Sequence, residues 1–436
     1  MEISSLYQLF LQYPLVCTDS RKCSKDSIFF ALKGENFNGN AFAAKALEAG
    51  CAYAIIDEEL YDTKGDNRLI LVNNVLKVLQ DLANYHRRQL GTKIIGITGT
   101  NGKTTTKELV AAVLQQKYNV LYTEGNLNNS IGVPLTLLRL KPEHDIAIVE
   151  MGASHPGDIK ELVEIAEPDY GIITNVGMAH LQGFGSLEGV INTKGELYEH
   201  LRAKKGSLVF INKDNELLTN IAGGLDCIYY GCSGKEEGLS VSGKVIDCTP
   251  YLHFQWKTAD GTWQDVQTNL IGSYNIDNML AAATIGLHSG VKPEQINIAL
   301  SEYIPQNNRS QLKHTEYNHL IIDAYNANPT SMTAALKNFS GMNVSPKMVI
   351  LGDMKELGEC SLGEHERIAN ILSNSAFDKV WLVGNEFSKI PTPPTFVKFN
   401  DVEQVNTAIQ KENIKGFYIL IKGSNSMRLI QTVEYL

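Results

Sequence analysis

The chain has 436 residues, more than a single hydrophobic core usually serves, so about two to three domains are expected. Its 43% hydrophobic and 20% charged residues are typical of a globular protein, and no run reaches the roughly 18 apolar residues of a membrane span. The net charge of −9 argues against nucleic acid as a partner. No basic residue precedes the apolar N-terminal segment, so we expect no signal peptide and a cytoplasmic protein. The seven cysteines include no C-x-x-C pair, which predicts reduced, mostly structural thiols and no zinc framework.

Residues 1–87 are predicted to form a small mixed α/β domain. The apolar runs 27–32 and 52–57 are typical of strands, and the segment 40–50 between them has a helical pattern that ends in glycine. A second helix, from Val75 to Gln89, is expected to lead into the next domain.

Residues 88–307 alternate strand and helix patterns, which predicts a doubly wound, mostly parallel sheet. Its expected strands are 93–98, 145–150, 170–176 and 207–212. From Cys227 to Gly272, apolar and polar residues alternate before an Asp260-Gly261 turn, so β-hairpins are expected as an addition to this sheet. In residues 308–436 the strand-helix rhythm resumes, with strands at 319–325, 347–353, 379–384 and 417–423, which predicts a third, Rossmann-like α/β domain.

A phosphate-binding loop is predicted between the strand 93–98 and the helix that follows it. The loop has the sequence GTNGKTT, formed by Gly99, Thr100, Asn101, Gly102, Lys103, Thr104 and Thr105. The glycines allow the backbone N–H groups to face a phosphate, and the helix adds its positive end. Lys103 would contribute charge and Thr104 a Mg²⁺ ligand. The loop is shorter than the common GxxxxGK[ST] pattern; the alternative is a glycine-rich turn beside a surface lysine.

Three further side chains are candidates for the same site. Glu150 ends an expected strand, where the carboxyl edge of a parallel sheet binds ligands, and its carboxylate suits Mg²⁺. The alternative for Glu150 is a solvated glutamate at a strand end. His180 and Lys194 lie in the segment that follows another strand, and by residue type alone each is more typical of a structural or surface position.

Eight motifs in order resemble those of the Mur ligase family, and with the runs TDSR (18–21) and FALKGENFNG (30–39), which resemble the family's N-terminal domain, the matches extend along residues 18–428. The eight motifs are TGTNGKTTTKE, GNLNNSIGVPLTLL, VEMGASHPGDI, NVGMAHLQGFGSLEGVINTKGELY, YNIDNMLAAA, IIDAYNANPTSM, LGDMKELGE and LIKGSNSMR. Within the family, DAYNANP and LGDMKELG are similar to the members that add a dipeptide, and the D-Y-A-H-T-P stretch of the sibling that adds one amino acid is missing.

The resemblance implies roles for individual residues. Thr104, Glu150, His180 and Lys194 would hold two Mg²⁺ ions, with Lys194 modified by CO₂ to a carbamate. A cationic neighbourhood favours the neutral amine that reacts with CO₂, and the carbamate is an oxygen ligand that suits Mg²⁺. Of the remaining residues, Asn275 and Asn278 would contact adenine, Arg309 and Asp323 would bind ATP from the third domain, and Asp19, Ser20, Arg21, Lys33 and Gly34 would hold the UDP end of the substrate. Tyr274 stands where the family often has histidine, and Arg309 could instead be a surface arginine and Asp323 a strand-end aspartate.

The implied activity is an ATP-dependent amide ligase of EC 6.3.2 type. It would join D-alanyl-D-alanine to UDP-N-acetylmuramoyl-tripeptide through an acyl phosphate, in the synthesis of peptidoglycan precursors and hence in cell-wall biogenesis, cell shape and division. A monomer is the family's default. Two alternatives stay open: another ligase of the superfamily, such as a folylpolyglutamate synthetase, and a nucleotide-binding switch that hydrolyses ATP without ligating anything.

Overall fold

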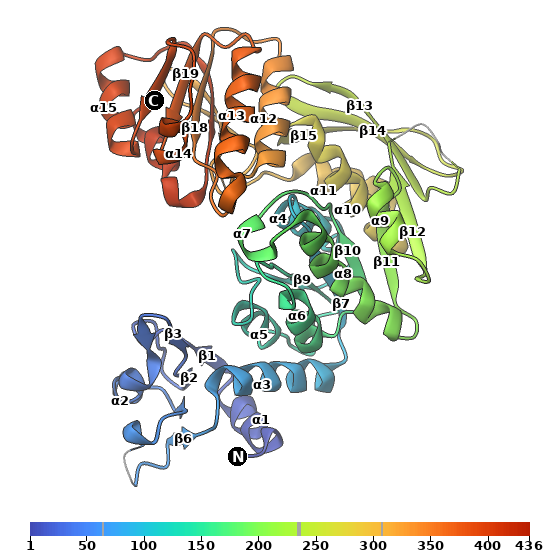
Figure 1. The fold of residues 1–436 in the computed structure, drawn as a ribbon. Coiled ribbons are helices and arrows are strands. Elements are labelled where there is room, and N and C mark those ends of the chain that lie inside the picture. The colour runs from blue at the N-terminus through green and yellow to red at the C-terminus, as the bar shows by residue number, and fades with distance from the viewer. Residues whose placement is uncertain (63–64, 233–236, 307) are drawn as a thin grey trace. The chain divides into compact units, whose positions relative to one another are not determined.

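The computed structural model describes residues 1–62, 65–232, 237–306 and 308–436 (Figure 1). By compactness the chain divides into two units. The first comprises Met1–Gly96, Tyr118–Gly152 and Asp158–Tyr170; the second comprises Ile97–Lys117, Ala153–Gly157 and Gly171–Leu436. The predicted boundaries after residues 87 and 307 stay predictions, and residue 307 lies outside the described ranges.

The N-terminal sheet has four parallel strands in the order β1-β2-β5-β6. Strand β2 is buried on both faces, which explains its unbroken apolar sequence. Helix α3 begins at the cap Asn74, whose side chain accepts from the N–H of Lys77, and ends at Gly91 in the left-handed conformation. The elements are α1 (Ile3–Gln12), β1 (Leu15–Cys17), β2 (Ser27–Phe30), β3 (Lys33–Gly34), β4 (Phe37–Asn38), α2 (Ala43–Glu48), β5 (Tyr53–Ile56), β6 (Leu69–Leu71) and α3 (Val75–Leu90).

A nine-stranded sheet follows, with the order β15-β14-β13-β12-β11-β10-β7-β9-β8. Strands β13, β14 and β15 pair antiparallel, as the alternation in the sequence predicts, and in β14 the buried residues alternate with partly exposed ones. The strands are β7 (Lys93–Thr98), β8 (Val120–Tyr122), β9 (Ile146–Glu150), β10 (Tyr170–Ile173), β11 (Leu208–Asn212), β12 (Cys227–Gly231), β13 (Val241–Cys248), β14 (Tyr251–Thr258) and β15 (Gln264–Ile271).

Helices α4 and α10 pack closely against each other in the second unit. Small residues of α10 allow this approach, because a Cβ placed on Gly286 would lie only 2.4 Å from Val113 Cγ1 of α4. The helices between the first sheet and the C-terminal one are α4 (Lys103–Leu114), α5 (Gly132–Leu137), α6 (Asp158–Ala166), α7 (Leu181–Phe184), α8 (Leu187–Ala203), α9 (Glu216–Ile221), α10 (Ile276–His288) and α11 (Pro293–Glu302).

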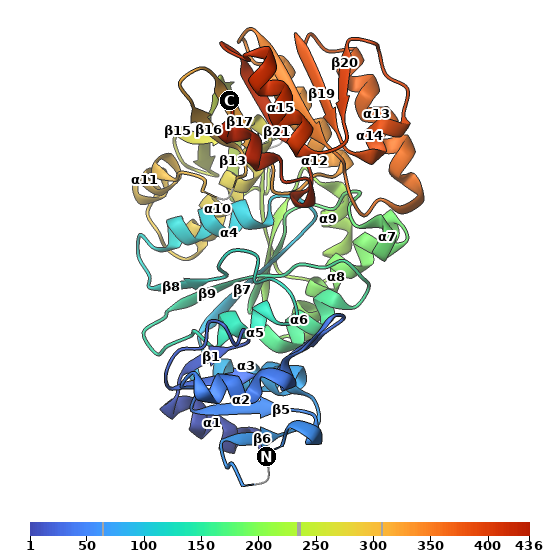
Figure 2. The same cartoon turned by 90° about the vertical axis from the view of Figure 1, so that its left-hand side faces the viewer.

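The C-terminal sheet has the order β16-β17-β21-β18-β19-β20 and is parallel except for β16. Along β18, Met348 and Ile350 pack under α15, while Val349 and Leu351 pack under α12 and α13, so helices cover both faces (Figures 1 and 2). The elements are β16 (Gln311–His314), β17 (His319–Asp323), α12 (Pro329–Gly341), β18 (Lys347–Gly352), α13 (Ser361–Ser373), β19 (Lys379–Val383), α14 (Asn385–Lys389), β20 (Phe396–Phe399), α15 (Val402–Glu412) and β21 (Tyr418–Lys422).

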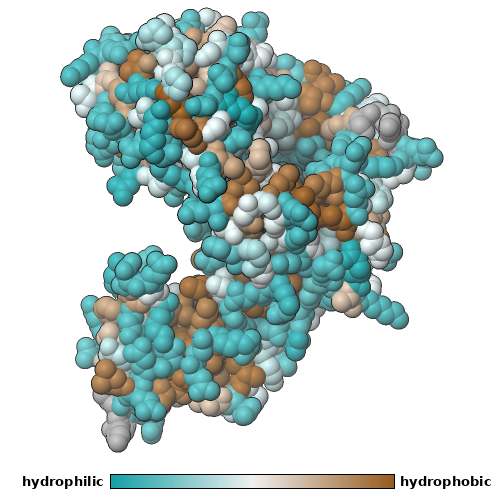
Figure 3. Space-filling model, in the orientation of Figure 1, coloured by the Kyte–Doolittle hydropathy of each residue, from teal (hydrophilic) through white to brown (hydrophobic). Residues whose placement is uncertain are grey.

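The predicted α/β class, with parallel sheets and an antiparallel hairpin addition, is confirmed. Hydrophilic side chains cover much of the face seen in Figure 3. Within the described residues, no helix is both long and apolar enough to cross a membrane.

Candidate active site

The predicted phosphate loop joins β7 to α4 and has a fixed conformation. Gly99 and Gly102 have φ values of 141° and 80°, and a Cβ on Gly99 would lie 2.0 Å from Thr174 Oγ1, so only glycine fits there. Lys103 is the first residue of α4, and its Nζ donates to the carbonyl oxygens of Gly99 at 2.7 Å and Thr100 at 3.1 Å. The first N–H groups of α4 have no acceptor within the helix and open toward the loop, the arrangement that binds phosphate.

Three predicted residues gather in the second unit: Lys103, His180 and Lys194. His180 precedes α7 with a φ of 52°, and its Nδ1 contacts a carboxylate oxygen of Glu356. Burial lowers the pKa of His180, and the nearby charges of Lys103 and Lys194 add to that effect, while Glu356 opposes it. Lys194 lies in the middle of α8 and not at a helix start, and its Nζ is 5.5 Å from the ring centroid of Phe184.

Lys194 is buried, with only 2% of its surface exposed, and its charge acts on His180 together with that of Lys103. A carbamate on Lys194 stays a prediction. Among the described residues, no three His, Cys, Asp or Glu side chains are grouped to hold a metal ion. The predicted Mg²⁺ ligands are not such a group, because two of them are the Thr104 hydroxyl and a carbamate oxygen on Lys194.

Glu150 lies in the first unit, at the end of β9, and is 1% exposed. Its Oε1 accepts from Asn128 Nδ2 at 2.8 Å, and its backbone N–H donates to Thr123 Oγ1 at 3.0 Å. The bond from Asn128 orients the carboxylate, and the burial of Glu150 excludes a solvated glutamate. Asn128 was not predicted as a site residue, although the motif GNLNNS contains it.

Asn275 and Asn278 form a buried network at the start of α10. Asn278 Nδ2 donates to Asn275 Oδ1 at 2.8 Å, and Thr106 Oγ1 of α4 donates to Asn278 Oδ1 at 3.0 Å. Asn275 Nδ2 also donates to the carbonyl of Ile271 at 2.8 Å. A Cβ on Gly102 would lie 2.7 Å from Asn278 Oδ1. The two asparagines therefore connect α10 to the phosphate loop, and their contact with adenine stays a prediction.

Asp323 ends β17 beside a residue that was not predicted, Lys422, which ends the neighbouring β21. Lys422 Nζ lies 2.6 Å from Asp323 Oδ2 and also donates to the carbonyl of Asn326 at 3.2 Å. Lys422 is 1% exposed. The guanidinium of Arg309 lies 4.0 Å above the ring centroid of Tyr325. The only sequence signal for Lys422 was its place in the motif LIKGSNSMR.

The phosphate loop also contacts the start of α12. Asn328 Nδ2 donates to Asn101 Oδ1 at 2.7 Å, and Asn328 Oδ1 accepts from the N–H of Ser331 as the cap of α12. Asn328 thus caps the start of α12 and also holds Asn101 of the phosphate loop.

The predicted UDP-binding residues lie in two ion-paired groups of the first unit. Arg21 donates to both carboxylate oxygens of Asp19 at 2.9 Å, and these hydrogen bonds lower the pKa of Asp19 to about 2. Lys33 Nζ lies 3.0 Å from Asp57 Oδ1 and 3.6 Å from Glu58 Oε1. Ser20 lies between the first pair, and Gly34 follows Lys33 in β3.

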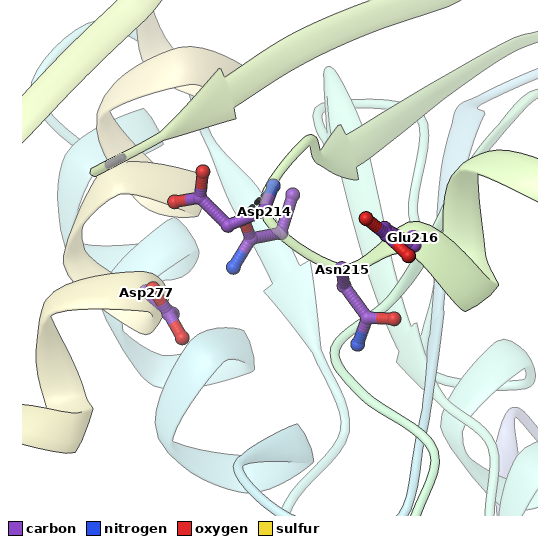
Figure 4. Close-up of a pocket in the computed structure, with 5 residues that line it drawn as sticks. Asp214, Asn215, Glu216 and Asp277 are labelled. Carbon is purple, nitrogen blue, oxygen red and sulfur yellow. Dashed lines mark hydrogen bonds between the residues drawn. The ribbon is translucent and has the colours of Figure 1, made fainter. Parts of the chain in front are cut away.

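A pocket of about 600 Å³ lies elsewhere in the second unit, beside α10 (Figure 4). Asp214, Asn215 and Glu216 line it from the segment after β11, and Asp277 lines it from α10. Burial and the nearby charge of Asp214, against a hydrogen bond from Asn212, raise the pKa of Asp277 to about 6. The carboxylates that line the pocket would repel phosphates, so this pocket is not suited to bind the triphosphate of ATP.

Domain profiles of one family match most of the chain. The Mur ligase middle domain matches residues 97–286, the Mur ligase glutamate ligase domain 308–425, and the Mur ligase family catalytic domain 12–87. The chain belongs to the Mur ligase family. It is 35% identical to the UDP-N-acetylmuramoyl-tripeptide–D-alanyl-D-alanine ligase of Bacillus subtilis, over 97% of this chain and 92% of the relative. It is 34% identical to the ligase of the same name from Escherichia coli, over 97% of this chain and 93% of the relative.

Solved structures agree with this family. MurF from Acinetobacter baumannii matches with a TM-score of 0.88 at 29% identity, over 99% of this chain and 97% of that one. MurF from Thermotoga maritima in complex with ADP matches with a TM-score of 0.85 at 26% identity, over 98% and 97%. A mutant of L. casei FPGS shares the fold at 17% identity and a TM-score of 0.59, over 82% of this chain and 95% of that one. The predicted three-domain Mur ligase fold is thus confirmed, and the roles of single site residues stay predictions.

Proposed function

We propose that this Mur ligase joins D-alanyl-D-alanine to the terminal carboxylate of UDP-N-acetylmuramoyl-tripeptide, with conversion of ATP to ADP and phosphate, in peptidoglycan synthesis. The observation that carries the proposal is the 35% identity over 97% of the chain to the ligase of that name from B. subtilis. The structural neighbour that holds ADP supports ATP as the nucleotide. We propose a cytoplasmic location, because ATP and UDP-linked substrates are available there, and a monomer.

The reaction has two steps. The tripeptide carboxylate attacks the γ-phosphate of ATP, which forms an acyl phosphate and releases ADP. The amine of D-alanyl-D-alanine then attacks the acyl carbon, loses a proton and displaces phosphate, so an amide replaces the acyl phosphate. The acyl phosphate is needed because a free carboxylate is a poor acyl donor.

The phosphate loop would bind and orient ATP. The N–H groups at the start of α4 and the Lys103 ammonium stabilise negative charge on the phosphates. Gly99 and Gly102 keep the loop backbone free of side chains that would block the phosphates. Asn275, Asn278, Arg309 and Asp323 are proposed for the remainder of ATP, and Asp19, Ser20, Arg21, Lys33 and Gly34 for the UDP end of the substrate.

Thr104, Glu150, His180 and the carbamate of Lys194 are proposed as the ligands of two Mg²⁺ ions. Bound Mg²⁺ would neutralise phosphate charge during transfer. The hydrogen bond from Asn128 orients the Glu150 carboxylate, and burial lowers the pKa of His180, which favours the neutral imidazole that binds metals.

A coupled phosphate-release assay tests the function. With ATP alone, slow release is expected; release should rise strongly only when both UDP-N-acetylmuramoyl-tripeptide and D-alanyl-D-alanine are added, with stoichiometric product by mass spectrometry. Release that the two substrates leave unchanged would instead identify a nucleotide switch.

The Lys194→Ala variant tests the carbamate. It is expected to lose ligation, and formate or acetate should restore part of it by supplying the missing carboxylate. The matched control is Lys205→Ala, a change at an exposed lysine just beyond α8, which should keep full activity without any response to formate. A fully active Lys194→Ala enzyme would contradict the carbamate assignment.

A further inference from the structure

Three of the seven cysteines meet in the N-terminal domain. Cys17 ends β1, Cys23 follows six residues later, and Cys51 follows α2. The Cys23 thiol donates to Cys17 Sγ at 3.2 Å and also hydrogen-bonds with Cys51, which lies 3.2 Å from Ser27 Oγ. Cys17 and Cys23 pack on the edge of the domain core, where both are partly exposed, whereas Cys51 is buried.

The pair Cys17 and Cys23 is arranged for a disulfide. A disulfide joins sulfurs about 2.05 Å apart, so the two Sγ atoms need to approach by only about 1.1 Å. Burial raises the pKa of the Cys23 thiol, with Cys51 and Cys17 adding to that effect, so Cys23 keeps its proton and donates it toward Cys17. Because Cys17 accepts this hydrogen bond and is partly exposed, we expect it to be the sulfur that reacts first with an oxidant.

We propose that Cys17 and Cys23 are a site of oxidative modification. An oxidant of the peroxide class would convert the two thiols to a disulfide that links the two ends of the loop 18–22. The Cys17 sulfur attacks a peroxide oxygen and becomes a sulfenic acid, with release of one water. The Cys23 sulfur then attacks the Cys17 sulfur and displaces the oxygen as a second water. Two thiols and one hydrogen peroxide thus give one disulfide and two waters, and the two sulfurs supply both electrons.

The disulfide would change the loop that carries Asp19, Ser20 and Arg21. In the reduced protein, the Cys17 thiol donates to the carbonyl oxygen of Asp19 at 3.0 Å. A disulfide has no S–H group, so this carbonyl loses that donor. Because these loop residues hold the UDP end of the substrate in the proposed function, on which this step rests, oxidation should weaken UDP binding.

Peroxide titration of the full chain tests the site directly. After treatment with hydrogen peroxide and alkylation of the remaining thiols, we expect a Cys17–Cys23 cross-linked peptide that is lighter by two hydrogens and is reversed by dithiothreitol. In Cys23→Ser, Cys17 should stop at the sulfenic acid and react with dimedone. Cys360, the exposed thiol, is the control, and Cys360→Ser should leave the cross-link unchanged. Two results would overturn the proposal. One is that Cys17 and Cys23 remain reduced, and are fully alkylated, at a peroxide dose that oxidises Cys360. The other is a disulfide to Cys51 in place of the one between Cys17 and Cys23.

Calorimetric titration with uridine diphosphate tests the consequence. The oxidised protein is expected to bind it about three- to tenfold more weakly than the reduced one, with recovery in dithiothreitol and no oxidant effect in Cys17→Ser. Unchanged affinity with the disulfide present would overturn the effect on the loop. A reduced protein that does not bind uridine diphosphate would count against the proposed function, and the mapped disulfide would still stand.

Discussion

Replacing Asp277 with asparagine is expected to stabilise the protein at neutral pH. Burial and Asp214 raise the pKa of Asp277 from 3.8 to about 6 in the folded state. Above pH 6, therefore, the Asp277 carboxylate is charged in the folded protein, although water solvates it better in the unfolded chain. The stability that the protonated acid gives is full below pH 3.8 and is lost as the pH rises through about 6. Asparagine has the same shape, stays neutral and can still accept the hydrogen bond from Asn212.

The size of the gain follows from the shift in pKa. A shift of roughly two units corresponds to about 3 kcal/mol, and water in the adjoining pocket lowers this to about 2 kcal/mol. For a domain of this size, that gain raises the melting temperature by about 4–8 °C. Near pH 4 the wild-type aspartate is mostly protonated in the folded state, so the two proteins should melt alike.

Calorimetric melting at pH 4, 5, 6, 7 and 8 measures the effect. The fluorescence of Trp256, which is fully buried in β14 next to α10, can follow the same domain in a background that carries both Trp263→Phe and Trp381→Phe. Asp260→Asn, in the exposed hairpin turn, is the matched control and should show no pH-dependent gain. A gain that is equal at all pH values, or a loss at pH 8, would refute the reasoning.

Three further changes test the site and the fold. Lys103→Ala should abolish turnover while circular dichroism stays unchanged; wild-type rates would refute the role of the phosphate loop. Lys422→Met should destabilise the C-terminal domain by about 3 kcal/mol in urea unfolding, because the charge on Asp323 stays behind, and adding Asp323→Asn should recover much of the loss. Gly102→Ala should weaken ATP binding at least tenfold, since its Cβ clashes with an oxygen of α10, whereas Gly91→Ala, which has open space, should leave ATP binding unchanged; equal effects would contradict the steric argument.

The fold was predictable where a pattern is local and strong. The strands β2, β7, β18 and β21 are short apolar runs buried on both faces, and β14 alternates because only one face is buried. Strands β8, β16 and β20 were not predicted. They have only three or four residues, and partly exposed positions occur in each, so pairing with a neighbour decides their structure more than their own sequence does.

The candidate site divides in the same way. The phosphate loop is contiguous in sequence, so its glycines, lysine and threonines could be recognised together. The pair Asp323 and Lys422 is separated by 99 residues and meets only because β17 and β21 are neighbours in the sheet. Cys17, Cys23 and Cys51 likewise gave no recognisable spacing, since their meeting depends on how β1 and α2 pack in the N-terminal domain.

The effect of the Asp277 charge on stability can be measured separately from ATP binding, because Asp277 and Asn278 of α10 point to different neighbours. Asn278 bonds to Thr106 and Asn275, on the side of the phosphate loop, whereas Asp277 faces Asn212 and the pocket. Successive helical residues point about 100° apart, so the two groups act on different neighbours. Asp277→Asn should therefore keep the ATP affinity of the wild type within about twofold while it melts higher at pH 8. A stabilised variant with much weaker ATP binding would instead mean that the carboxylate holds the start of α10 in the conformation that ATP needs.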